Sequence, residues 1–174
     1  RVNSTLFTKP FNKSFNMIGE TDKVYLIMSD TPIWTKTTGY INVYEFSRSV
    51  TEKVIDMNTQ RLLTKVASID AVDTTTKDWF TDGTKVYVNT GGVPTKQVIP
   101  IISASNFQIT SIPSNVYFEN LNFIGGRNTV EMTLTANNSA YFNNCTFNHS
   151  SNNYNGLAII GGKEVILNRC KAND

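Results

Sequence analysis

The chain has 174 residues, of which 40% are hydrophobic and 17% are charged, and its formal net charge is +2. This length suits one domain of ordinary size with a smaller part attached. The small net charge gives no reason to expect binding to nucleic acid or to a membrane surface, and no apolar run approaches the ~18 residues of a membrane-spanning helix.

The first 90 residues predict short, irregular β-structure. Strands are indicated at residues 23–29 (KVYLIMS), 40–46 (YINVYEF) and 85–90 (KVYVNT), which are rich in β-branched and aromatic residues. Turn residues separate these stretches, and Asp82-Gly83 just before the third stretch is typical of a hairpin.

Residues 47–63 fit either a short helix or strands. Ser49 is a suitable helix cap, with Glu52 three residues later. The apolar residues of this stretch fit a helical stripe only loosely, whereas KVIDM alternates as a strand does. We therefore favour strands here.

The second half of the chain contains a repeat. Three similar stretches begin at Val116 (VYFENLNF), Ala140 (AYFNNCTF) and Val165 (VILNRCKA), which are 24 and 25 residues apart. In each copy the apolar residues alternate, skip one position and alternate again, which indicates two short strands joined by a tight bend. A repeat of this length is typical of a solenoid, and the pattern fits a parallel β-helix best, with equivalent side chains ~4.8 Å apart on successive coils.

The alignment assigns each column of the repeat to a place in the coil. Phe118, Phe142 and Leu167 form an inward column, and Tyr117 and Tyr141 an outward one. Asn120 and Asn144 lie at the bend, where their amides are expected to hydrogen-bond from coil to coil. A further strand in each coil is expected to pair Met132 with Leu157 and Leu134 with Ile159.

These repeat lines resemble the right-handed parallel β-helix proteins of the pectin-lyase-like superfamily. The stretch DWFTDGTKVYV (78–88) resembles the segment that precedes the coils in many such polysaccharide-acting proteins, and similar segments occur in bacteriophage tail-spike and appendage proteins. The resemblance implies an all-β fold, with residues 1–90 as a β-rich N-terminal region that leads into the solenoid. Residues 91–174 are then the first coils of a β-helix that ends within a repeat, so we expect a piece of a longer protein.

The outward face of the coils is the predicted ligand-binding surface. Tyr117 and Tyr141 share an outward column, and aromatic faces suit the C–H surfaces of sugar rings. Glu119 and Asn143 share the next outward column, so no acidic pair forms there, and glycoside hydrolysis needs two carboxyl groups. The tyrosines fit a glycan face and a surface packed under the N-terminal region or a partner subunit equally well.

Metal and disulfide sites are not indicated. His149 is the only histidine and stands in a polar loop without a second imidazole or thiolates at ligand spacing, so no metal or other cofactor is predicted. Cys145 and Cys170 occupy one column on adjacent coils, where a bridge would be strained. We favour a stack of reduced, inward thiols over a disulfide.

Two functions remain open. One is a polysaccharide-binding or polysaccharide-degrading protein, a lyase or a glycoside hydrolase, with its active residues on further coils. The other is a non-catalytic spike, appendage or adhesin module, a stiff rod that binds glycan or assembles into a homotrimer. Both imply polysaccharide as the partner and an extracellular or virion-surface location, and whether the chain is an enzyme stays undecided.

Overall fold

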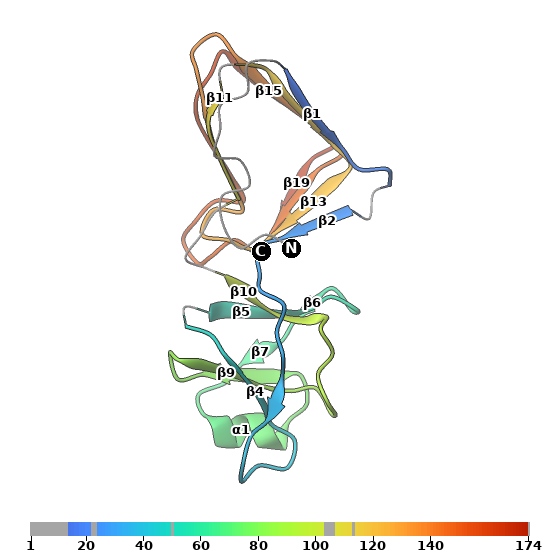
Figure 1. Cartoon of the computed structure of the whole chain (residues 1–174), viewed down its shortest axis with the longest axis vertical. Coiled ribbons are helices and arrows are strands. Elements are labelled where there is room, and N and C mark those ends of the chain that lie inside the picture. Colours follow the sequence, from blue (N-terminus) through green and yellow to red (C-terminus); the bar gives the residue numbers. More distant parts are fainter. Residues whose placement is uncertain (1–13, 22–23, 50, 103–106, 113, 174) are drawn as a thin grey trace. The chain divides into compact units, whose positions relative to one another are not determined.

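The computed structural model describes residues 14–21, 24–49, 51–102, 107–112 and 114–173 (Figure 1). The regular structure is almost entirely β-strand, and several of its sheets are parallel. The chain divides into two compact units. One contains the described residues of 14–28 and 107–173, and the other contains those of 29–102. This division differs from the predicted one at residue 90, because two strands near the N-terminus join the repeat.

The first unit consists of three parallel sheets, which Figure 1 shows as three sides around a common interior. The first sheet has the order β1 (Phe15–Ile18), β12 (Val116–Glu119), β15 (Ser139–Asn143) and β18 (Glu164–Asn168). The second has the order β2 (Val24–Ile27), β13 (Leu121–Ile124), β16 (Thr146–Asn148) and β19 (Lys171–Asn173). The third has the order β11 (Phe107–Ile112), β14 (Val130–Leu134) and β17 (Leu157–Gly161). Each successive coil of the chain adds one strand to each sheet.

The first coil is interrupted in sequence. Its strands are β1, β2 and β11, because these three pair with β12, β13 and β14 of the next coil. Residues 29–102, the whole of the second unit, therefore stand between the second and third strands of one coil. The second unit is thus an insertion into the first, and not a region that precedes it.

The coils stack in the predicted register. Phe118 of β12 pairs with Phe142 of β15, and Phe123 of β13 pairs with Phe147 of β16. The first pair of rings lies parallel with centroids 5.0 Å apart, and the second with centroids 5.5 Å apart. Phe118 and Phe142 are 0% and 1% exposed, which confirms the inward column. Leu167 continues this column on the edge strand β18 and is 52% exposed.

The asparagine side chains at the bends between the first two strands of each coil form a hydrogen-bonded ladder. Asn120 and Asn144 both adopt left-handed backbone conformations, with φ of 56° and 50°. Asn144 Nδ2 donates to Asn120 Oδ1 at 2.9 Å, and Asn120 Nδ2 donates to the Gly19 carbonyl at 3.3 Å. Asparagine tolerates this conformation better than most residues. The predicted amide ladder is confirmed, and Gly19 is its member in the first coil, where a Cβ would lie 2.5 Å from the Asn120 carbonyl oxygen.

The predicted register of the third strand in each coil was wrong by two residues. Met132 pairs with Ile159, and Leu134 with Gly161, instead of with Leu157 and Ile159. The paired residues are 27 positions apart in this sheet (130 to 157), but 24 apart between β12 and β15 (116 to 140). The loop of residues 149–156 before β17 is longer than the loop of residues 125–129 before β14, and a fixed repeat length could not account for this insertion.

The inserted unit contains two sheets and one short helix. The larger sheet has the order β3 (Thr35–Lys36), β4 (Tyr44–Ser47), β9 (Lys85–Asn89), β8 (Asp78–Thr81) and β7 (Thr64–Lys65). The smaller has the order β10 (Val98–Ile102), β5 (Thr51–Asp56) and β6 (Arg61–Leu62). Their core consists of buried aliphatic side chains around Trp79, against which Trp34 and Tyr44 pack: Val54, Leu63, Val86, Val88 and Val98. Trp34 Nε1 donates to the Val98 carbonyl at 3.2 Å, so this indole also satisfies its polar atom.

Residues 51–56 and 61–62 form β5 and β6, so the helix alternative for residues 47–63 was wrong. Three other stretches were predicted as strands. Residues 23–29 and 85–90 contain β2 and β9, although Lys23 lies outside the described residues, whereas only residues 44–46 of the stretch 40–46 are in a strand. Helix α1 (Ile69–Thr74) was not predicted. The Ser68 side chain caps it by accepting a hydrogen bond from the Ala71 amide at 3.3 Å, and Asn89 Nδ2 donates to the Val72 carbonyl at 2.9 Å.

The predicted hairpin at Asp82-Gly83 joins β8 to β9. Asp82 Oδ1 accepts hydrogen bonds from the Thr84 and Lys85 amides, each at 2.8 Å, and Oδ2 accepts one from the Tyr87 hydroxyl at 2.8 Å. The backbone bonds from Lys85 and Thr84 are the main cause that lowers the pKa of the Asp82 carboxyl well below its ordinary value. Gly83 has φ of 90°, as this turn requires.

We predict that Phe118→Ala lowers the free energy of unfolding by about 3–5 kcal/mol, because the lost ring contacts leave a cavity inside the stack. The matched outward variant Tyr141→Ala should cost no more than about 1 kcal/mol, since its side chain is only partly buried. Urea melts followed by circular dichroism measure both. Equal losses at the two positions would contradict the inward and outward assignment.

We predict that Asp82→Asn destabilises the inserted unit by about 1 kcal/mol at neutral pH, because Asn is a weaker acceptor for the turn amides. The native pKa of Asp82 is lowered, so its stabilisation is complete above the ordinary carboxyl pKa of about 4 and is lost as the pH falls below it. In melts, the difference in stability between the two proteins should therefore be smaller at about pH 3 than at about pH 6. A difference that grows on acidification would refute this role.

Candidate functional site

The candidate site is the outward face of the sheet β1-β12-β15-β18, which we call the tyrosine face. Side chains alternate between the two sides of a strand, so the buried Phe118 and Phe142 place their neighbours outside. The face consists of the outward residues of the four strands in register: Asn16, Ile18, Tyr117, Glu119, Tyr141, Asn143, Ile166 and Asn168. All four residues predicted from the sequence are therefore brought together on adjacent strands.

The two tyrosines are direct neighbours on parallel strands. Tyr117 pairs with Tyr141, and their columns continue to Asn16 on one side and Ile166 on the other. Both tyrosines are partly buried, so each ring keeps an accessible part. Adjacent parallel strands are ~4.8 Å apart, which places the two side chains within the span of a single sugar ring and its linkage.

Glu119 is held in place by hydrogen bonds from its neighbours. The Tyr117 hydroxyl donates to Glu119 Oε2 at 3.0 Å, and Asn143 Nδ2 donates to Glu119 Oε1 at 2.7 Å. Asn168 Nδ2 in turn donates to Asn143 Oδ1 at 2.9 Å. A carboxylate has about four acceptor positions, so Glu119 can still accept hydrogen bonds from a ligand hydroxyl.

A cavity of about 370 Å³ opens beside the tyrosines. Its lining comes from the first three strands of the sheet and the residues that precede them: Ser14, Asn16, Ile18, Asn115, Val116, Tyr117 and Tyr141. The sequence did not indicate the part from β1, because β1 is separated from β12 by about a hundred residues and has no detectable repeat signature. Only the pairing of Asn16 with Tyr117 places it there.

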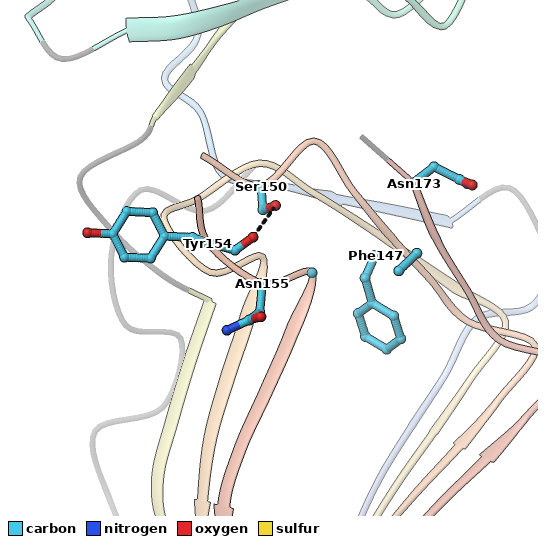
Figure 2. Close-up of a pocket in the computed structure, with 7 residues that line it drawn as sticks. Phe147, Ser150, Tyr154, Asn155 and Asn173 are labelled. Carbon is cyan, nitrogen blue, oxygen red and sulfur yellow. Dashed lines mark hydrogen bonds between the residues drawn. The ribbon is translucent and has the colours of Figure 1, made fainter. Parts of the chain in front are cut away.

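A second depression, of about 210 Å³, lies in the loop that precedes β17 (Figure 2). Ser150 Oγ donates to the Tyr154 carbonyl at 3.2 Å, and Figure 2 shows the Tyr154 ring pointing away from the other labelled side chains. The Arg127 guanidinium lies 5.0 Å from the centroid of that ring. The lining of the depression includes the Phe147 side chain but no pair of outward tyrosines like that of the tyrosine face.

Ion pairs lie at the surface of the inserted unit. Arg48 Nη1 lies 2.5 Å from Asp30 Oδ2, and Lys85 Nζ lies 2.6 Å from Glu45 Oε1. In the same unit the Tyr87 hydroxyl donates to Asp82, and burial together with this bond raises the pKa of Tyr87 to about 12. None of these residues lines the cavity beside the tyrosines.

The two cysteines are free thiols. Cys145 is fully buried, and burial raises its pKa to about 11, so it is a neutral thiol at physiological pH. Cys170 is only partly buried, and its Sγ donates to the Phe142 carbonyl at 3.4 Å. This agrees with the expected stack of inward thiols.

Comparison of the chain with family models, with curated proteins and with solved structures gave no match. Among the residues that the structure describes, no three His, Cys, Asp or Glu side chains gather in a way that could hold a metal ion. Within the same described ranges, no helix has the length and apolar character needed to cross a membrane.

We predict that iodoacetamide modifies Cys170 and leaves Cys145 unmodified in the native protein at about pH 7.5, because Cys145 is buried and protonated. Intact-mass spectrometry should show one added group before unfolding and two after unfolding in urea. A protein that takes up no label without reductant, and two labels with it, would indicate a disulfide and contradict the structure.

Proposed function

We propose that this chain forms part of a right-handed parallel β-helix of the pectin-lyase-like type and that its tyrosine face binds polysaccharide. In-register pairing within three parallel sheets supports the β-helix. Its hand is inferred from a general rule, since a strand that crosses over to a parallel neighbour in the same sheet does so in a right-handed sense in about 98% of cases.

The side chains of the tyrosine face suit the binding of an uncharged glycan. Tyr117 and Tyr141 offer apolar ring faces at one end of the cavity, while Asn16 and Asn115 offer amide groups around it. The hydrogen bonds from Tyr117 and Asn143 hold Glu119 as an oriented acceptor at the side. The observation that supports glycan binding most strongly is the combination of paired tyrosines and a fixed carboxylate beside one cavity.

We propose binding in preference to cleavage on the described part of this face. Glu119 and Glu164 are the only carboxylates on its four strands, among the residues described. Glu164 pairs with Ser139, four residues along the strand from the Asn143 that pairs with Glu119, which is about 13 Å at the rise of a β-strand. Glycosidases need their two carboxyl groups about 5–9.5 Å apart. A lyase or a hydrolase would therefore use residues other than this pair.

The alternative function is a spike, appendage or adhesin module in which this face packs against another copy. Ile18 and Ile166 lie on the face and are 58% and 41% exposed, which favours an interface of some kind. A homotrimer on an extracellular or virion surface is the assembly that this alternative implies. Light scattering after size exclusion separates the two, because a trimer built on this face dissociates in Ile18→Glu, whereas a glycan-binding monomer stays monomeric.

We predict that Tyr141→Ala weakens the affinity for a bound oligosaccharide at least about tenfold, because the aromatic surface below the sugar is lost. Tyr117→Phe should keep most of the affinity, since it retains the ring and loses only the hydroxyl that contacts Glu119. Titration calorimetry on glycans selected from an array gives both values.

The matched control is Tyr154→Ala, which removes an exposed tyrosine outside the cavity. Assays for new reducing ends and for unsaturated products run beside the titrations. Loss of affinity in the control to the same extent as in Tyr141→Ala would remove the tyrosine face from the proposal, and turnover by the wild type would favour the enzyme over the binding module.

A further inference from the structure

The inserted unit has a pocket of its own. A cavity of about 260 Å³ lies between the β5–β6 turn, the start of β7 and the segments that flank β8 and β9. We call it the cationic pocket, and its lining is Asp56, Thr59, Arg61, Leu62, Leu63, Thr64, Lys77 and Thr90. A neighbouring cavity of about 240 Å³ shares Asp56 and Thr90 with it, so the two adjoin.

Two cations of this pocket are not used by the fold. The ion pairs of Arg48 with Asp30 and of Lys85 with Glu45 include neither Arg61 nor Lys77. Both side chains are exposed at the pocket. Both charges are therefore accessible to solvent or to a ligand at the pocket.

The backbone around Lys77 is fixed although its conformation is uncommon for a residue with a side chain. Its φ is 70°, in the left-handed region. The Lys77 amide donates to the Asn89 carbonyl at 2.6 Å, and its carbonyl accepts from the Thr64 amide at 2.9 Å. These two bonds hold Lys77 next to Thr64 on the wall of the cavity.

The carboxylate in the pocket belongs to Asp56, which is the cross-strand partner of Arg61 and whose oxygens accept hydrogen bonds within the β5–β6 turn. Asp56 Oδ1 accepts a hydrogen bond from the Asn58 amide at 2.9 Å, and Oδ2 accepts one from the Thr59 hydroxyl at 3.1 Å. It retains acceptor positions for a ligand hydroxyl. The Thr90 hydroxyl donates to the Gly92 carbonyl at 2.9 Å, which leaves its oxygen free to accept a further bond.

We propose that the cationic pocket binds a carboxylated sugar residue, such as a uronic acid, of an acidic polysaccharide. Arg61 offers a planar fork that matches a carboxylate, and Lys77 adds a second positive charge. Asp56 and the threonines of the wall suit the ring hydroxyls, and Leu62, which is 38% exposed, offers an apolar contact to the ring C–H groups. The volume is below the ~300–1,000 Å³ of a drug-sized ligand site, which fits one sugar ring, with the adjoining cavity for the next.

This site is distinct from the tyrosine face and rests on the proposed function only in that the ligand is a polysaccharide. The cationic pocket is expected to prefer a negatively charged sugar. The four strands of the tyrosine face, in contrast, contain no Lys or Arg among the residues described. The two sites can therefore be tested separately in the same chain.

The experiment is an NMR titration of the full 174-residue protein with digalacturonate and with the matching neutral digalactose. Amide shifts of Thr64 and Thr90 report on the cationic pocket, and those of Tyr117 and Tyr141 report on the tyrosine face. We expect the acidic sugar to shift the first set at millimolar concentration or below, and the neutral sugar to do so at least about tenfold more weakly. Loss of one charge-assisted contact in Arg61→Gln should weaken the acidic sugar at least about tenfold, and Lys77→Gln should have a similar effect.

The matched control is Lys65→Gln, because Lys65 belongs to the same unit but lies over the Trp79 ring, 5.1 Å from its centroid. It should bind the acidic sugar as the wild type does. The proposal is overturned if the acidic sugar leaves Thr64 and Thr90 unshifted, if the neutral sugar binds there equally well, or if Arg61→Gln binds like the wild type. Each of these results leaves the outcome at the tyrosine face to be read independently from its own amides.

Discussion

The structure of the first unit depends on one constraint, the in-register stacking of parallel strands around a shared interior. Phe118 over Phe142 and Phe123 over Phe147 place like rings on like, 5.0 and 5.5 Å apart between centroids. The same register satisfies the backbone from coil to coil and lines up the asparagines at the bends. A one-residue slip would turn every ring toward solvent, so the burial of this column specifies the whole stack.

The stacking also determines what the outer surface can present. Because the inward rings alternate with outward side chains, the register that buries Phe118 and Phe142 is the one that sets Tyr117 beside Tyr141 and Glu119 beside Asn143. The inserted unit follows a different rule. It has its own core around Trp79 and its own hydrogen-bonded turns, so it can carry a pocket whose chemistry is independent of the coils. In our proposals the tyrosine face contacts sugar rings and the cationic pocket binds a sugar acid.

The features that could be predicted from the sequence are those that belong to the repeated motif. The inward phenylalanines, the outward tyrosines and Asn120 with Asn144 recur every 24 or 25 residues, and a period reveals a stack directly. Strands β1 and β2 were not assigned to the stack, because residues 29–102 separate them from their coil and they carry no copy of the motif. Helix α1 was missed since its six residues bury only Val72 and depend on tertiary contacts. The cationic pocket could not be foreseen, because it gathers residues from three separate segments of the chain.

The most direct test of the account is the set of nuclear Overhauser contacts between β12 and β15 in solution. The account predicts contacts between the ring protons of Phe118 and Phe142, whose centroids are 5.0 Å apart, and amide contacts that follow the parallel register of Tyr117 with Tyr141. Strong contacts between opposing Hα protons of the two strands, as antiparallel pairing produces, or the lack of any contact between the two rings, would contradict it.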